Sequence, residues 1–148
     1  MSQNERGYTA VEAMITVSIV VIALFAGISI GNAVWVSRVK SAAQQVASAF
    51  QQARQYAVSN GATYAVTLTG TTIAISCTGG CRPDYTPEPS TEILNGATTS
   101  VPVSPITFGP MGTGDQPGTV VVTYPGAPDW QVRVTGAGGV RACSPTCS

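Results

Sequence analysis

The sequence contains no histidine and little charge. Lys and Arg together number 7, Asp and Glu number 7, and charged residues make up 9% of the 148 positions. Without histidine, the chain lacks the commonest general base and the commonest metal ligand. No nucleophile motif and no carboxylate cluster takes its place, so we expect no enzyme, no cofactor and no metal. A net charge of zero gives no broad attraction to nucleic acid or anionic lipid.

Charge is absent altogether from one long stretch near the N-terminus. No Asp, Glu, Lys or Arg occurs from Ala13 to Ser37, a mostly apolar run of 25 residues. As a helix rising about 1.5 Å per residue, this run crosses a hydrocarbon core of about 30 Å. We therefore predict a transmembrane helix over residues 8–36. Glu12 stands at its start, and a carboxylate there is either functional or marks the interfacial end of the helix.

The residues around Glu12 resemble the class III signal of type IV prepilins. A polar leader ends at Gly7, Tyr8 stands where Phe or Met is usual, and Glu12 becomes the fifth mature residue. The resemblance implies that a prepilin peptidase removes leader 1–7 by cutting between Gly7 and Tyr8, and that the new amine of Tyr8 is methylated. The alternatives are a secretory signal or a simple membrane anchor. The apolar run is, however, longer than the roughly 7–15 residues of a secretory signal.

The same resemblance implies a role for Glu12 in filament assembly. Among packed apolar helices, an unpaired carboxylate would be protonated or destabilising. The amine of Tyr8 on a neighbouring subunit would supply a partner for Glu12, and this pairing would set the axial register between subunits.

Proline is also missing from the N-terminal half, since the first proline of the chain is Pro83. With no helix breaker in the way, we predict that the helix continues as an amphipathic segment over residues 37–60. Asn60-Gly61 is the predicted stop, because both residues tolerate left-handed backbone angles. Apolar residues recur at steps of three and four along one face of this segment. This apolar stripe comprises Val39, Ala42 or Ala43, Val46, Phe50, Ala53 and Ala57.

Residues 61–148 change to the alternating pattern of β-strands. Thr63–Thr69 and Thr72–Ser76 flank Gly70-Thr71 and predict a hairpin. One long helix followed by short strands predicts an α+β fold, with the apolar stripe packed on an antiparallel sheet or β-sandwich head. Further strands are predicted at Ile93-Leu94, Val101–Val103, Ile106–Phe108, Thr119–Tyr124, Trp130–Thr135 and Val140–Ala142, with a loop at Cys77–Pro89.

Three later motifs resemble the GspH/FimT family of minor pilins and pseudopilins. They are F-x-x-A-R-x-x-A at Phe50–Ala57, I-T-F-x-P-x-G at Ile106–Gly112 and V-R-V-T-G-x-G-G-V-R at Val132–Arg141. The resemblance implies a single-pass protein of the bacterial inner membrane with its head, residues 61–148, in the periplasm. It would initiate or cap a type IV pilus or a type II secretion pseudopilus. Its partners would be other pilin or pseudopilin subunits, the prepilin peptidase and inner-membrane lipid.

Four cysteines form two C-x3-C pairs, Cys77 with Cys81 and Cys143 with Cys147. An even number in a small exported domain favours disulfides, and four cysteines allow three pairings. We favour the local pairs, because each closes a short loop that contains Gly or Pro. A zinc site of four thiolates is the alternative, since this spacing suits zinc.

Arg133 and Arg141 are the only basic residues among the last sixty. Some members of the GspH/FimT family bind DNA during natural transformation through a C-terminal Gly-Arg-x-Arg. The matching positions here read Gly138-Gly139-Val140-Arg141, so the first arginine is missing. A DNA receptor for uptake is therefore the alternative function. We favour the interpretation that Arg133 and Arg141 are solvated surface residues, because binding to DNA phosphates needs several cations.

Overall fold

A computed structural model describes residues 9–85, 90–93, 96–101 and 105–144, with residues 26–33 described by their backbone alone. The chain divides into two compact units, Met1–Val34 and Trp35–Ser148. The elements in chain order are α1 (Ala10–Asn60), β1 (Thr63–Thr69), β2 (Thr72–Gly79), β3 (Thr91–Glu92), β4 (Thr98–Ser100), β5 (Ile106–Phe108), β6 (Gly118–Thr123), β7 (Trp130–Val134) and β8 (Val140–Cys143).

The first unit contains the N-terminal part of α1. Large apolar side chains are exposed along the helix from Val11 to Phe25, with exposed fractions between 44% and 73%. A folded core does not cover them within this unit. Among the described residues, no helix has both the length and the hydropathy that crossing a membrane requires.

The second unit is built on the C-terminal part of α1. Every residue of the predicted apolar stripe has an exposed fraction of 0%, with Ala42 and Ala43 both included. The helix stops where predicted, because Gly61 adopts a φ of 61° and the Ala62 N–H donates to the Ala57 carbonyl at 3.1 Å. These are the features of a glycine-terminated helix end. The 3.6-residue period of the sequence therefore identified the buried face correctly.

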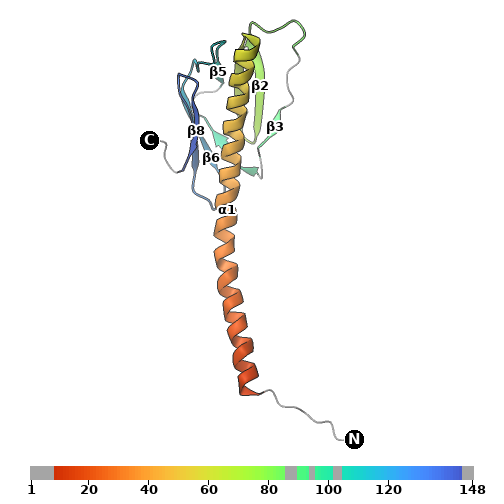
Figure 1. Cartoon of the computed structure of the whole chain (residues 1–148), viewed down its shortest axis with the longest axis vertical. Coiled ribbons are helices and arrows are strands. Elements are labelled where there is room, and N and C mark those ends of the chain that lie inside the picture. The colour runs from red at the N-terminus through yellow and green to blue at the C-terminus, as the bar shows by residue number, and fades with distance from the viewer. Residues whose placement is uncertain (1–8, 86–89, 94–95, 102–104, 145–148) are drawn as a thin grey trace. The chain divides into compact units, whose positions relative to one another are not determined.

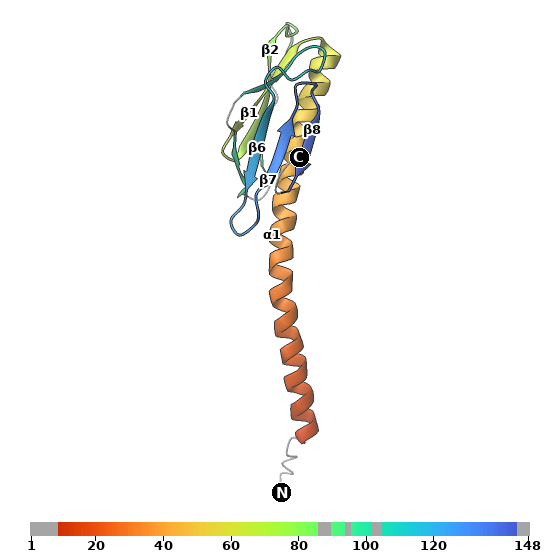
Figure 2. The ribbon, with the colours of Figure 1, turned by 90° about the vertical axis from the view of Figure 1, so that its left-hand side faces the viewer.

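Two four-stranded antiparallel sheets complete this unit, in the orders β3-β2-β1-β5 and β4-β6-β7-β8. Their strands gather around the C-terminal part of α1 (Figure 1). Figure 2 shows β6, β7 and β8 side by side, with β8 next to α1. The predicted α+β fold is confirmed. The sheets contribute Tyr64, Val66, Leu68, Ile73, Ile75, Ile106, Phe108, Val120, Val122, Val132 and Val134 to one core with the stripe.

Three strand predictions were wrong in position. β2 runs on to Gly79 into the predicted loop, because Thr63 of β1 pairs with Gly79. The strand expected at Ile93-Leu94 is β3, two residues earlier, and Ile93 is buried in the core instead. The strand expected at Val101–Val103 is β4, whose threonines pair with β6. Predictions that followed apolar residues missed the positions of β3 and β4, because the residues of these two strands are polar.

A ring cluster attaches the beginning of the second unit to its sheets. The Trp35 ring lies 5.5 Å from the Tyr124 ring, measured between centroids. The Arg38 guanidinium lies 5.2 Å from the Trp35 ring centroid and donates to the Tyr124 hydroxyl at 3.3 Å. Aromatic and cation–π contacts of this kind stabilise by about 0.5–1 kcal/mol each. Trp35 therefore belongs to the second unit and contacts the loop after β6.

We expect the Phe50→Ala variant to lose about 3–5 kcal/mol of unfolding free energy, because Phe50 is fully buried at the centre of the stripe. The measurement is chemical denaturation of the full chain in detergent, followed by near-UV circular dichroism. Met111→Ala is the control, since Met111 is 87% exposed and its loss should change stability by less than about 0.5 kcal/mol. Equal losses in the two variants would contradict the stripe as the centre of the core.

Candidate functional site

Glu12 lies in the first turn of α1 and is exposed. Its backbone N–H donates to the Thr9 hydroxyl at 3.4 Å and to the Thr9 carbonyl at 3.0 Å. Thr9 therefore caps the helix, and Thr-x-x-Glu is the signature of a capping box. A negative charge in the first turn also interacts favourably with the helix dipole. Thr9-Ala10-Val11-Glu12 carries this signature in the sequence, so the local role of Glu12 could have been predicted.

The surroundings of Glu12 on the helix are apolar. It is the only ionisable residue between Ala10 and Ser37, and Val11, Met14 and Ile15 beside it are all more than half exposed. The predicted cleavage residues Gly7 and Tyr8 lie outside the described residues. Cleavage, methylation and the pairing of Glu12 with an amine therefore stay predictions.

The three motifs that resemble the GspH/FimT family converge in the second unit. The rings of Phe50, in the first motif, and Phe108, in the second, have centroids 6.3 Å apart. Nε of Arg54 donates to the carbonyl of Gly112 at 3.0 Å. One apolar and one charge-assisted polar contact thus join α1 to β5 and to the loop that follows β5. We call the contact of Arg54, Gly112 and Gly138 the motif junction.

Gly138 brings the third motif to this junction. Gly112 and Gly138 have φ angles of 73° and 75°, which favour glycine. A Cβ on Gly138 would overlap the Gly112 carbonyl oxygen and lie 2.9 Å from Nε of Arg54. The two loops that contain these glycines also share a hydrogen bond, from the Gly114 N–H to the Gly136 carbonyl at 3.1 Å. The close approach of two backbones therefore requires glycine at position 138.

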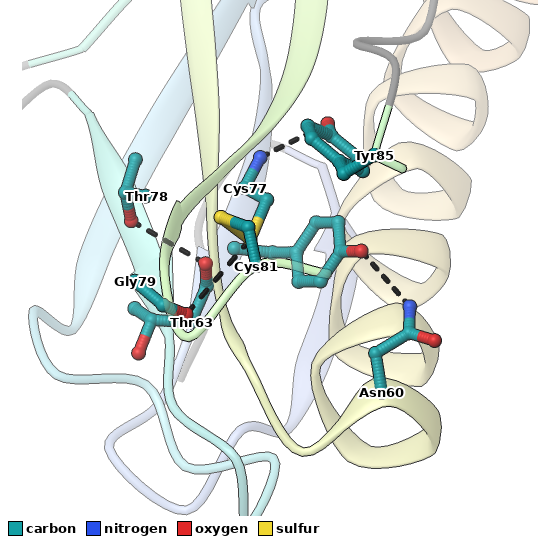
Figure 3. Close-up of a disulfide and its surroundings, with 8 residues drawn as sticks. Asn60, Thr63, Cys77, Thr78, Gly79, Cys81 and Tyr85 are labelled. Carbon is teal, nitrogen blue, oxygen red and sulfur yellow. Dashed lines mark hydrogen bonds between the residues drawn. A yellow bond between two sulfur atoms is a disulfide. The ribbon is translucent and has the colours of Figure 1, made fainter. Parts of the chain in front are cut away.

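Cys77 and Cys81 form a disulfide, the first of the two local pairs predicted from the sequence. Figure 3 shows this disulfide between β2 and the segment that carries Tyr85. Its sulfurs are therefore not thiolates, and the four-thiolate zinc site is not formed. Cys143 is disulfide-bonded as well, whereas Cys147 lies outside the described residues, so the second local pair stays a prediction. Among the described residues, no three His, Cys, Asp or Glu side chains gather as metal ligands would.

Arg133 and Arg141, the candidate DNA contacts, are brought together by the second sheet. Arg133 of β7 pairs directly with Arg141 of β8, and both are exposed. Like charges directly opposite each other in adjacent strands are destabilising. The sheet therefore presents two adjacent cations on its outer face.

A family profile described as "Type II transport protein GspH" matches residues 42–138. The chain belongs to the GspH family. The matched range contains Arg54, Gly112 and Gly138, so the motif junction lies entirely within the GspH-family region. No curated protein matches the sequence.

Two solved structures share the fold of this GspH-family chain. The type IV minor pilin FimU of Pseudomonas aeruginosa is 19% identical, with a TM-score of 0.59 over 71% of this chain and 87% of FimU. The minor pseudopilin EpsH from the type 2 secretion system of Vibrio cholerae is 15% identical, with a TM-score of 0.56 over 74% of this chain and 99% of EpsH. Similarity at these identities establishes a pilin-like fold.

The motif junction predicts a large effect of Gly138→Ala on the stability of the GspH-family head. We expect a loss of about 3 kcal/mol or more, because a positive φ costs a non-glycine residue about 1–2 kcal/mol and the new methyl group meets backbone. The matched control is Gly126→Ala, because Gly126 has a φ of 81° and a Cβ there would meet nothing within 4 Å. Chemical denaturation of both variants measures the difference. Equal losses would show that backbone conformation alone, and not the close approach, requires Gly138.

Proposed function

We propose that this GspH-family chain is a minor pilin or pseudopilin, a structural subunit that initiates or caps a type IV pilus or a type II secretion pseudopilus. The observation that carries the proposal is the exposed apolar surface of α1 from Val11 to Phe25. A helix that is apolar on all sides is stable only where lipid or other helices cover it. Neighbouring helices in a filament would provide that cover. The likeness to a minor pilin and a minor pseudopilin supports this role.

We further propose a route to the filament through the inner membrane. Residues 8–34, the part of the predicted span that precedes the second unit, would lie in the bilayer, the prepilin peptidase would cut between Gly7 and Tyr8, and the new amine would be methylated. The head would fold in the periplasm. The sequence around Gly7 supports the cleavage step, and the Cys77–Cys81 disulfide supports an oxidising compartment.

Glu12 has a specific task in this proposal. Once α1 packs among other helices, its carboxylate loses water and needs a partner of opposite charge. The amine of Tyr8 on a neighbouring subunit would meet that need at one axial position. An ion pair in apolar surroundings would therefore select the register in which the subunit enters the filament.

We expect Glu12→Ala to be processed normally but excluded from filaments. Intact mass should show that both the variant and the wild type begin at Tyr8 and carry one extra methyl group. Sheared filaments should contain at least about tenfold less of the variant, because losing a charged pair among apolar groups costs more than about 1.4 kcal/mol.

Glu12→Gln separates the two roles of this residue. Glutamine can replace glutamate in a capping box but carries no charge, so it should fail to assemble as Ala does. Normal assembly of Glu12→Gln would reduce Glu12 to a helix-capping residue. A wild-type chain that starts at Met1 would contradict the prepilin route itself.

DNA binding is the second candidate function, favoured by the cross-strand pair of Arg133 and Arg141. Two cations release few counterions, so the logarithm of the duplex binding constant should fall with the logarithm of salt concentration at a slope of about −2. The double variant Arg133→Gln/Arg141→Gln should lose this binding, while Lys40→Gln, an exposed cation on α1, should keep it. Binding that persists in the double variant would exclude this pair as the DNA contact.

A further inference from the structure

A pocket of about 270 Å³ opens at the C-terminal end of α1. The helix, the first sheet and the segment after the disulfide all contribute to it. None of its residues takes part in the assembly role proposed above. Its lining is rich in tyrosine and comprises Tyr56 and Asn60 from α1, Tyr64 from β1, Ile75 from β2, and Arg82, Asp84 and Tyr85.

Three aromatic rings in contact form the wall of the pocket. The Tyr64 ring lies 5.7 Å from the Tyr56 ring and 5.8 Å from the Tyr85 ring, between centroids. Tyr64 and Tyr85 meet edge to face, at an interplanar angle of 89°. Tyr64 is only 4% exposed and belongs to the core. The rings are therefore held in a fixed arrangement before any ligand arrives.

Hydrogen bonds fix the polar ends of two of these rings. The Asn60 amide Nδ2 donates to the Tyr64 hydroxyl at 2.9 Å, and the Cys77 N–H donates to the Tyr85 hydroxyl at 3.0 Å (Figure 3). Each phenol oxygen therefore acts as an acceptor, and the O–H of the half-buried Tyr85 is left to donate to a ligand. Asn60 likewise retains its Oδ1 as an acceptor. The pocket thus offers both donors and acceptors.

The disulfide helps to hold the mouth of the pocket. It closes the loop from Cys77 to Cys81, and the Tyr85 N–H then donates to the Arg82 carbonyl at 3.0 Å. This turn brings Arg82, Asp84 and Tyr85 to the pocket. Arg82 and Asp84 are both exposed, and their opposite charges cancel.

These features indicate the chemistry of the ligand. Aromatic faces accept the C–H face of a small ring, whereas the phenols, Asn60, Asp84 and Arg82 exchange hydrogen bonds with groups that both donate and accept. Cancelling charges favour neither a free phosphate nor a cation. The volume lies near the lower limit for ligand pockets, about 300 Å³, and so suits one ring. We propose that this pocket binds one sugar residue of a glycan.

Saccharide titrations of the full chain, in a detergent that contains no sugar, test this proposal. N-acetylglucosamine and N,N′-diacetylchitobiose represent bacterial cell-wall sugars, and galactose and lactose represent galactose-terminated surface glycans. We expect one of the two pairs to bind in the millimolar range or tighter and to shift the NMR signals of ring-labelled Tyr64 and Tyr85. The pair that binds identifies the source of the glycan. Absence of binding by all four saccharides would overturn the proposal.

Matched variants locate the binding at this pocket. Tyr85→Phe and Asp84→Asn should each weaken it at least about tenfold, because each removes a hydrogen bond to the ligand. Tyr124→Phe and Asp129→Asn make the same changes outside the pocket and should leave the affinity unchanged. If both pairs behaved alike, the binding would lie elsewhere and the inference would fail. Filament incorporation should be normal in all four variants, so the result stands apart from the assembly proposal.

Discussion

The burial of one stripe of α1 is the interaction on which the head depends. The stripe is fully buried, and the inner faces of both sheets contribute to the same core. The strands have between two and eight residues, and sheets this small are not stable with an apolar face open to water. The C-terminal part of α1 therefore covers the apolar faces of both sheets. This packing explains why the compact unit begins at Trp35 and includes the second half of the helix.

The side chains of the stripe also explain the motif junction. Alanines at positions 42, 43, 53 and 57 are fully buried and let the helix backbone approach the sheets closely, while Phe50 fills the remaining space against Phe108. That close approach places Arg54 within reach of the Gly112 carbonyl. Because Gly138 has no side chain, the loop between β7 and β8 can pack against the same carbonyl. The three motifs that carry the family resemblance are thus the parts of one packing contact.

The sequence predicted those features that depend on local pattern. A 3.6-residue period marked the buried face of α1, and a two-residue period with Gly70 between its halves marked the β1–β2 hairpin. Pairings between distant strands were not accessible, because β3 and β4 carry mainly threonine and other polar residues, whose burial is decided by their neighbours. The sugar pocket was missed for a related reason. Its tyrosines, at positions 56, 64 and 85, come from α1, from β1 and from the loop after β2, and they share no local pattern.

The two units of the chain differ in the exposure of their apolar side chains. The head buries its own core, whereas α1 leaves every large apolar side chain from Val11 to Phe25 exposed within its unit. With net charge near zero, repulsion between copies is weak and does not oppose association. Apolar contact alone has no preferred register, because it is non-directional. Glu12 supplies the direction in the proposed filament, since any packing that leaves its carboxylate unpaired carries a large desolvation cost. One charged side chain on an apolar helix is then sufficient to select a single arrangement among many of similar apolar contact.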